Sequence, residues 1–321
     1  MLRGAKLTGN GCLNYLCVRM ETEIHTLLTD LTSGNRKALA RGITLVENEI
    51  PGYEEILLNL KQEKYVPVIG ITGPPGSGKS TLVNSLISVL VKNTSACVGV
   101  ISVDPSSPLH NGAILGDRLR MNEHFNNKQV FIRSLATRGA LGGLSAKAIE
   151  VTELMRYAGF DYIIVETAGV GQSEVEIAGL ADVTLLVLTP EAGDEIQAMK
   201  SGIMEIADIF VVNKADRDGA DEFSKNLYQT MPLKGGKNTE MDVVKTIATQ
   251  HEGIEELVEV IKKHLQDKSI SDTSNLWAEK AYRLIIRRRM AGISKEKLKE
   301  EIEKELKSDP AFNVYSFISK Y

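Results

Sequence analysis

The chain has few cysteines, no excess of basic charge and no long apolar run. Its 321 residues include three cysteines, Cys12, Cys17 and Cys97. A small and odd number of cysteines argues against a disulfide framework and is typical of a protein in a reducing cytoplasm. The net charge is −4, from 38 basic and 42 acidic residues, which gives no electrostatic reason to expect nucleic-acid binding. No apolar run approaches the about 20 residues that span a bilayer, so we expect a cytoplasmic protein that does not cross a membrane.

The sequence pattern divides the chain into four segments. Residues 1–20 lack the apolar core of a signal peptide, and we expect them to be disordered or to be a misassigned start, with translation beginning at Met20. Residues 21–64 repeat apolar positions at helical spacing and predict an N-terminal helical extension. Residues 65–268 alternate strand and helix patterns. Residues 269–321 predict a highly charged helical arm, which is either solvated or a dimerisation element.

Short apolar runs between residues 65 and 268 predict a buried sheet. Several are almost continuously apolar, as in TLLVLT and IFVVN, which is typical of strands covered on both faces. Helical stretches separate these runs, and the alternation predicts a doubly wound, mainly parallel α/β sheet with helices on both sides. The predicted strands span residues 66–72, 97–103, 129–133, 162–166, 183–188, 209–213 and 243–247.

The first predicted strand is followed by GPPGSGKS, residues 73–80. This run fits G-x-x-x-x-G-K-[ST] between a strand and a helix, the pattern of a phosphate-binding P-loop. Its backbone N–H groups and the helix N-terminus would bind phosphate oxygens. Lys79 would reach the β- and γ-phosphates, and the Ser80 hydroxyl would hold Mg²⁺. The predicted nucleotide-binding residues of this loop are Gly73, Pro75, Gly76, Ser77, Gly78, Lys79, Ser80 and Thr81.

The sixth predicted strand leads into NKAD, which fits N-K-x-D and predicts guanine as the base. The Asp216 carboxylate can accept hydrogen bonds from guanine N1–H and the 2-amino group, whereas adenine would leave it unpaired. Asn213 would tie the loop together, and the stem of Lys214 would lie against the ring. A second loop, after the last predicted strand, would offer a backbone N–H to guanine O6. Its predicted residues are Ile247, Ala248 and Thr249.

Acidic residues at the ends of two strands predict a Mg²⁺ site. Asp104 ends the second strand, at the edge where ligands gather in open α/β sheets. It would bind Mg²⁺ directly or through water, or orient the attacking water; a turn aspartate is the alternative. Asp117, in the long connection that follows, is a second candidate acid. Glu166 lies in VETAGVGQSE, where it would join the Mg²⁺ shell while the Gly169 N–H senses the γ-phosphate.

The predicted hydrolysis apparatus departs from that of signalling GTPases. Val170 follows Gly169, where a water-positioning glutamine is usual, and Gln172 is nearby but shifted. We therefore expect slow intrinsic hydrolysis that a partner raises. Residues 189–208, TPEAGDEIQAMKSGIMEIAD, predict a further mobile stretch. The alternative is a solvated helix N-terminus, where the helix dipole favours acidic residues.

Together these stretches resemble the MeaB/ArgK GTPases, chaperones of cobalamin-dependent acyl-CoA mutases such as methylmalonyl-CoA mutase. The resemblance covers roughly residues 21–290. It is carried by GPPGSGKSTL, SVDPSSP, ILGDRLRM, FIRSLATRGALGGLS, VETAGVGQSE, NKAD and the stretch 189–208. It implies a SIMIBI-type G domain with N- and C-terminal helical extensions, a homodimer, and a B12-dependent acyl-CoA mutase as the partner.

The resemblance also implies an activity and roles for particular residues. GTP would be hydrolysed to GDP and phosphate in order to gate delivery of adenosylcobalamin and to protect or rescue the mutase. The implied catalytic residues are Lys79, Asp104 and Glu166. The implied ligands of Mg²⁺ are Ser80, Asp104, Asp117 and Glu166. A third switch, residues 189–200, would relay the nucleotide state to the mutase, and its implied residues are Asp194, Glu195, Gln197 and Lys200.

Two other functions remain open. A nickel-type metallochaperone GTPase on the same fold would need clustered histidine and cysteine, whereas the five histidines lie apart along the sequence. A kinase, of the lysine/arginine/ornithine transport type for example, would need an acceptor pocket and would usually lack N-K-x-D.

Overall fold

The structure is a computed structural model of the chain, which falls into two compact units, Met1–Trp277 and Ala278–Tyr321. The described residues are 22–61, 64–104, 121–124, 126–136, 146–167, 169, 173–192, 202–230, 242–290, 292–308 and 312–321. Each unit is treated by itself.

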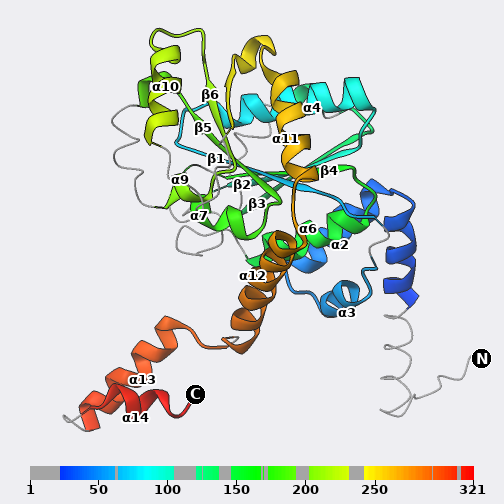
Figure 1. Cartoon of the computed structure of the whole chain (residues 1–321). Coiled ribbons are helices and arrows are strands. Elements are labelled where there is room, and N and C mark those ends of the chain that lie inside the picture. Colours follow the sequence, from blue (N-terminus) through cyan, green and yellow to red (C-terminus); the bar gives the residue numbers. More distant parts are fainter. Residues whose placement is uncertain are drawn as a thin grey trace, which may run out of the picture. The chain divides into compact units, whose positions relative to one another are not determined.

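In the described part of the first unit, seven parallel strands form one sheet in the order β3-β2-β4-β1-β5-β6-β7 (Figure 1). This confirms the predicted doubly wound α/β fold. The strand order reverses around β1, so the loops that follow β1 and its neighbours meet at one edge of the sheet. The strands are β1 (Val68–Thr72), β2 (Val98–Asp104), β3 (Val130–Ala136), β4 (Tyr162–Glu166), β5 (Val183–Leu188), β6 (Ile209–Asn213) and β7 (Asp242–Thr246).

Strand ends differ slightly from the predicted ones. β1 begins after Pro67, a residue without a backbone N–H to donate. β3 runs to Ala136, which lies opposite Asp104 of β2. This longer pairing carries both strands to the edge of the sheet where the nucleotide loops gather.

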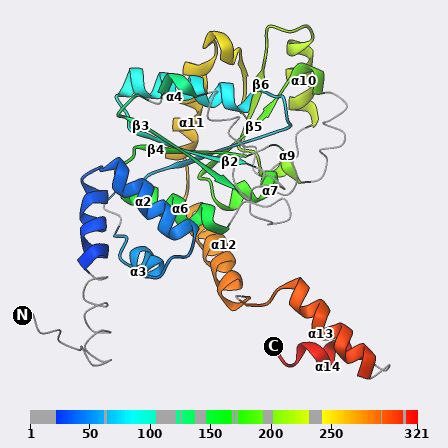
Figure 2. The same cartoon turned by 180° about the vertical axis from the view of Figure 1, so that it is seen from behind.

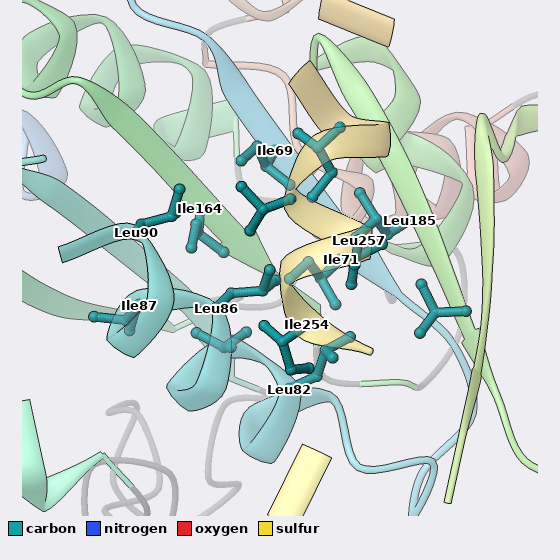
Figure 3. Packing of buried hydrophobic residues seen from close by; sticks show 14 of the residues in the cluster. Ile69, Ile71, Leu82, Leu86, Ile87, Leu90, Ile164, Leu185, Ile254 and Leu257 are labelled. Atoms are coloured by element: carbon teal, nitrogen blue, oxygen red, sulfur yellow. The ribbon is translucent and has the colours of Figure 1, made fainter. Parts of the chain in front are cut away.

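One face of the sheet is covered by α4 (Lys79–Thr94) and α11 (Ile254–Gln266), as both views show (Figures 1 and 2). Their apolar side chains interdigitate with those of the central strands, which fixes the helix that follows the P-loop on the sheet (Figure 3). The residues at the centre of this cluster include Leu82, Leu86, Ile254, Leu257, Ile69, Ile71, Ile164 and Leu185.

The opposite face carries α6 (Ala146–Tyr157), and α2 (Arg36–Glu47) packs on α6 (Figure 2). The two helices lie close together at Gly42: a Cβ added to this residue of α2 would lie 3.1 Å from Leu154 Cδ2 of α6. α2 begins at Asn35, whose side chain accepts hydrogen bonds from two backbone N–H groups of the first turn. The helical extension of the N-terminal region therefore belongs to the packed body of the first unit.

Shorter elements complete the first unit. The helices α9 (Ile203–Ile206) and α10 (Ala220–Thr230) pack with apolar side chains of β5 and β6 in a second cluster. The other short elements are α3 (Tyr53–Leu58), η1 (Asn122–His124), α7 (Ser173–Glu176), η2 (Ile177–Gly179), η3 (Pro190–Ala192) and η5 (Ala248–Gln250). A helix over residues 22–32 precedes α2.

The helix α12 (Ile270–Arg289) crosses the division between the units, and α13 (Lys295–Ser308) and α14 (Val314–Ile318) lie in the second unit. The Tyr321 hydroxyl donates to Glu301 Oε2 at 2.6 Å, which joins the C-terminus to α13. The second unit also has many exposed apolar side chains: Tyr282, Ile285, Ile286, Met290, Leu306, Val314, Tyr315, Ile318 and Tyr321. Over the described residues, none of the helices has both the length and the apolar character required to traverse a bilayer.

Candidate functional site: a guanine nucleotide pocket

The P-loop lies between β1 and α4 and is pressed against its neighbours on both sides. Gly73 has φ 139°, and a Cβ there would lie 2.2 Å from the carbonyl oxygen of Val187 in β5. Gly78 has φ 90°, and its Cβ would lie 2.4 Å from Asn213 Nδ2. Only glycine fits these two positions. The backbone of the P-loop can therefore approach β5 and the side chain of Asn213, which belongs to the predicted base-binding segment.

The side chains of Lys79 and Ser80 are buried at the start of α4. Lys79 Nζ donates hydrogen bonds to the carbonyl oxygens of Gly73 and Pro74, at 2.8 and 3.0 Å. The lysine is thus held across its own loop, where phosphates bind in P-loops. Ser77 Oγ is buried with no hydrogen-bond partner among the described residues. It is a polar atom that a ligand of this loop would satisfy.

The structure brings Ser80 and Glu166 together, because Ser80 Oγ donates to Glu166 Oε1 at 2.6 Å. Glu166 ends β4 and is 3% exposed. A hydroxyl and a carboxylate oxygen are the ligands that Mg²⁺ prefers, so this pair fits the ion. Of the other predicted acids, Asp104 ends β2 at the same edge of the sheet, and its side chain is not described. Asp117 lies outside the described residues.

A cavity of about 180 Å³ lies beside the P-loop, where the sequence predicts the base. Its lining residues come from α4, the N-K-x-D segment and the loop after β7: Gly78, Thr81, Asn213, Lys214, Asp216, Arg217, Ile247, Ala248 and Thr249. The structure thus places every predicted residue of the guanine loops around one cavity. Pro75 and Gly76 lie at the exposed tip of the P-loop.

Asn213 holds the three loops of this cavity together. Its Nδ2 donates to the carbonyl oxygen of Ser77 at 2.8 Å, and its Oδ1 accepts from Thr246 Oγ1 and from the Ala248 N–H, each at 3.2 Å. Lys214 Nζ donates to the carbonyl oxygen of Gly76 at 2.8 Å. These bonds join the phosphate loop to the base loops, so that the base and the phosphates are bound by one connected frame.

Two further residues lie at the cavity or support its loops, and the sequence analysis did not predict them. Arg217 lines the cavity and pairs with Glu191, which lies in η3. A hydrogen bond from Arg217 lowers the pKa of Glu191. Ser85 Oγ donates to the carbonyl oxygen of Ala248 at 2.6 Å, which ties α4 to the base loop. Arg217 directly follows the N-K-x-D motif, so its position in the sequence could have indicated a role at the base. Ser85 belongs to no recognisable sequence motif.

The predicted switch residues Asp194, Glu195, Gln197 and Lys200 lie outside the described residues. Gly169 is described and has φ 80°. Among the described residues, no group of three or more histidine, cysteine, aspartate or glutamate side chains is placed to hold a metal ion.

Comparison with known proteins identifies the family. A model of the methylmalonyl-CoA mutase-associated GTPase MeaB family matches residues 39–305. The chain belongs to the MeaB family. This confirms the resemblance found in the sequence, and the protein is accordingly a GTPase that binds GTP and GDP.

Individual relatives agree with this assignment. This MeaB-family chain is 43% identical over 292 residues to a candidate GTPase of Pyrococcus abyssi, covering 89% of the chain and 83% of the relative. It is 39% identical over 208 residues to the GTPase ArgK of Escherichia coli, covering 62% of each chain. It is 38% identical over 213 residues to the mitochondrial methylmalonic aciduria type A homolog of Caenorhabditis elegans, covering 62% of the chain and 53% of the relative.

A solved structure, that of a LAO/AO transport system kinase, matches with a TM-score of 0.64 at 24% identity and covers 94% of this chain and 96% of that one. At this identity the likeness shows the fold alone.

Proposed function

We propose that this GTPase is a nucleotide-controlled chaperone of a B12-dependent acyl-CoA mutase of the methylmalonyl-CoA mutase type. It gates the loading of adenosylcobalamin and protects or reactivates the mutase. The observation that carries the proposal is the match of residues 39–305 to a family described as mutase-associated. The relative from C. elegans, which is named for methylmalonic aciduria, supports the same assignment.

The nucleotide site supports a role in timing. Ser80 and Glu166 would hold Mg²⁺, with Asp104 and Asp117 as the other predicted ligands; the 2.6 Å contact between the Ser80 hydroxyl and Glu166 supports the first pair. Bound Mg²⁺ supplies charge neutralisation at the β- and γ-phosphates. The residues of the chain bind and orient GTP: Lys79 contacts the phosphates, and Asp216 accepts the hydrogen bonds of guanine.

Hydrolysis is expected to depend on a partner, because Val170 occupies the position of the usual water-positioning glutamine. The stretch 189–200 is the proposed relay to that partner. Its first part is close to the base: Glu191 pairs with Arg217, which lines the guanine cavity. A change at the nucleotide therefore has a short path to the start of this stretch.

The second unit supports the proposed homodimer. Its exposed apolar side chains include Tyr315, at 78% exposure, and Tyr282, at 63%. Exposed apolar groups gathered on one segment are typical of surfaces that a protein partner covers. A second copy of the chain is the occupant that the resemblance implies.

The function is tested with the purified protein and the B12-dependent mutase of the same organism. Binding is measured without nucleotide, with GDP and with a non-hydrolysable GTP analogue, and GTP turnover is measured with and without the mutase. We expect complex formation that depends on the nucleotide, and faster turnover when the mutase is present. The Lys79→Ala variant is the control, since it should lose turnover in both conditions. No complex in any nucleotide state would contradict the proposed function.

A further inference from the structure

A second cavity lies at the amino edge of the sheet, the edge opposite the nucleotide loops. Its volume is about 410 Å³, against about 180 Å³ for the guanine cavity. It lies where β1 and β4 begin and where α4 and α11 end. Residues at these four ends line it: Pro67, Tyr162, Thr94 and Gln266. A cavity of this size is typical of small-molecule sites, and none of the roles described above uses it.

The hydrogen-bonding groups that this cavity leaves unused are mostly donors. Lys64 and Lys262 both line it. Lys64 Nζ donates to Asp161 Oδ1, and Lys262 Nζ donates to Glu259 Oε1, each at 2.7 Å. An ammonium group has three N–H bonds, so both lysines have further hydrogen bonds to donate. The Tyr162 hydroxyl, which also lines the cavity, makes no hydrogen bond within the described part of the chain.

The acceptor groups around the cavity are largely occupied. The carboxylate that lines it, that of Asp161, accepts from Lys64 at Oδ1 and from the Cys97 N–H at Oδ2. The ends of α4 and α11 carry partial negative charge, which is offset by basic residues in their last turns, Lys92, Lys263 and His264. Free donors beside occupied acceptors favour a ligand with acceptor oxygens, which is a carboxylate or a phosphate.

Two aromatic rings line the same cavity, those of Tyr65 and Tyr162. The hydroxyl of Tyr65 donates to Asp182, which fixes this side chain, although 46% of the residue is exposed. An aromatic ring fixed in this way offers a surface to a planar or apolar group. The lining therefore fits a small organic anion, in which a carboxylate or phosphate group is joined to a flat or apolar part.

The elements at this cavity also lead to the nucleotide site. α4 begins at Lys79 of the P-loop, and α11 follows the base loop at Ile254. β1 runs from the cavity to the P-loop, and β4 runs from it to Glu166. Side chains of the two helices and the two strands interdigitate in one apolar cluster (Figure 3). Because such close packing transmits displacements, a ligand at one edge of the sheet can act on the other.

We propose that this cavity is a regulatory site, which binds a small organic anion and thereby changes the affinity of the protein for guanine nucleotide. The effect is reciprocal, because a ligand that changes nucleotide affinity has its own affinity changed by the same factor. The proposal concerns the GTPase alone and does not depend on the mutase.

Binding is tested by calorimetry on the full chain saturated with Mg²⁺ and GDP, so that the nucleotide site is filled. The probes are phenyl phosphate, benzoate and inorganic phosphate. We expect at least one organic probe to bind more tightly than inorganic phosphate, because the tyrosine rings contribute; the tighter of the two identifies the anionic group. Lys262→Gln should weaken this binding about tenfold, the effect of losing a hydrogen bond to a charged group.

The matched control is Lys263→Gln, the same change at the next residue of α11. Lys263 does not line the cavity, and its side chain is 64% exposed, against 31% for Lys262. Its replacement should change probe binding by less than about twofold. Both lysines make pairs at the surface, which contribute little to stability, so both variants should fold as the wild type does.

Regulation is tested by measuring the affinity for fluorescent GDP with and without a saturating concentration of the tighter probe. We expect a change of at least about fivefold, the lower end of typical couplings, in the wild type and in Lys263→Gln but not in Lys262→Gln.

Three results would overturn the proposal. The first is that neither organic probe binds. The second is that Lys262→Gln leaves binding or its effect on GDP unchanged, since the probe would then act at another place, the P-loop included. The third is that a probe binds in the cavity and GDP affinity stays the same. These measurements contain no mutase, so they are independent of the chaperone proposal.

Discussion

Replacing Asp182 with asparagine should strongly destabilise the first unit, because Asp182 is the centre of a buried ionic cluster. Its carboxylate is inaccessible to solvent and accepts hydrogen bonds from the Val68 N–H and Arg156 Nη2, each at 2.8 Å, and from Lys268 Nζ at 2.7 Å. The Tyr65 hydroxyl donates to the same group. The four donors come from β1, from the segment before it, from α6 and from the segment after α11. One carboxylate thus joins four parts of the first unit.

The magnitude follows from the burial of Arg156. Its side chain is also inaccessible, and its guanidinium lies 5.2 Å from the centre of the Tyr65 ring and 5.5 Å from that of Trp277. Asp182→Asn leaves this buried cation with only a longer carboxylate contact among the described residues, from Arg156 Nη1 to Glu153 Oε1 at 3.8 Å, and turns an amide NH₂ toward hydrogen-bond donors. Breaking a buried pair from one side costs about 3–5 kcal/mol, a large part of the about 5–15 kcal/mol that stabilises a typical protein.

The assay is urea unfolding followed by circular dichroism, with Asp161→Asn as the matched control. Asp161 also accepts a backbone N–H, that of Cys97 at 2.9 Å, and a lysine, Lys64 at 2.7 Å. Its side chain is 39% exposed, however. Exposed pairs contribute about 0–1 kcal/mol, so the control should lose far less. A loss below about 1 kcal/mol for Asp182→Asn would refute the reasoning that the ion pair of Asp182 with Arg156 is buried and that the 3.8 Å contact to Glu153 does not replace it.

The same carboxyl predicts a pH dependence. Burial by itself raises the pKa of Asp182, but Arg156, Lys268 and Tyr65 outweigh it and hold the pKa below the usual 3.8. A carboxyl whose pKa is lower in the folded state stabilises the fold above its unfolded pKa and loses this contribution as the pH falls through the folded pKa. The difference between wild type and Asp182→Asn should therefore be constant near neutral pH and shrink only below about pH 4.

Further predictions concern the nucleotide site and the second unit. Lys79→Ala should abolish phosphate release from GTP, and unchanged turnover would contradict the P-loop assignment. Asp216→Asn should reduce the preference for GTP over ATP in competition binding by about 100-fold, the effect of losing two hydrogen bonds to a charged group; an unchanged preference would contradict the guanine site. Ser85→Ala removes the 2.6 Å hydrogen bond to the Ala248 carbonyl and should raise the KM for GTP about fivefold at similar kcat; an unchanged KM would show that this tie is not needed. Tyr315→Ser should lower the dimer fraction in sedimentation, and a monomeric wild type would contradict the dimer.

The sequence predicts the sheet well because parallel strands buried on both faces are short, continuous apolar runs. The predicted strands 162–166, 183–188 and 209–213 coincide with β4, β5 and β6 to the residue. The P-loop and N-K-x-D are equally visible, since phosphate and guanine binding demand particular residues at fixed spacing. The strands and the two motifs can be predicted because each is defined by residues that are close together in the sequence.

Contacts between distant parts of the sequence were not predictable in the same way. The partners of Asp182 lie at positions 65, 68, 156 and 268, and no local pattern links them. In the sequence, Asp182 is one acidic residue before a strand, as Asp161 is before the strand 162–166. Only the fold makes the first a buried hub and leaves the second at the surface.

The contact between the start of α4 and the end of β4 illustrates what the fold adds to the motifs. Glu166, the last residue of β4, accepts the hydrogen bond of Ser80, and Lys79 donates to the carbonyl oxygens of Gly73 and Pro74. Ser80 and Lys79 are adjacent, and nucleotide binding makes demands on both: the serine for Mg²⁺ and the lysine for phosphate. GTP must therefore compete with or replace both contacts at once. Because the Ser80–Glu166 bond joins α4 to β4, the arrival of GTP and Mg²⁺ acts on the end of β4 as well as on the P-loop, which follows from neither motif alone.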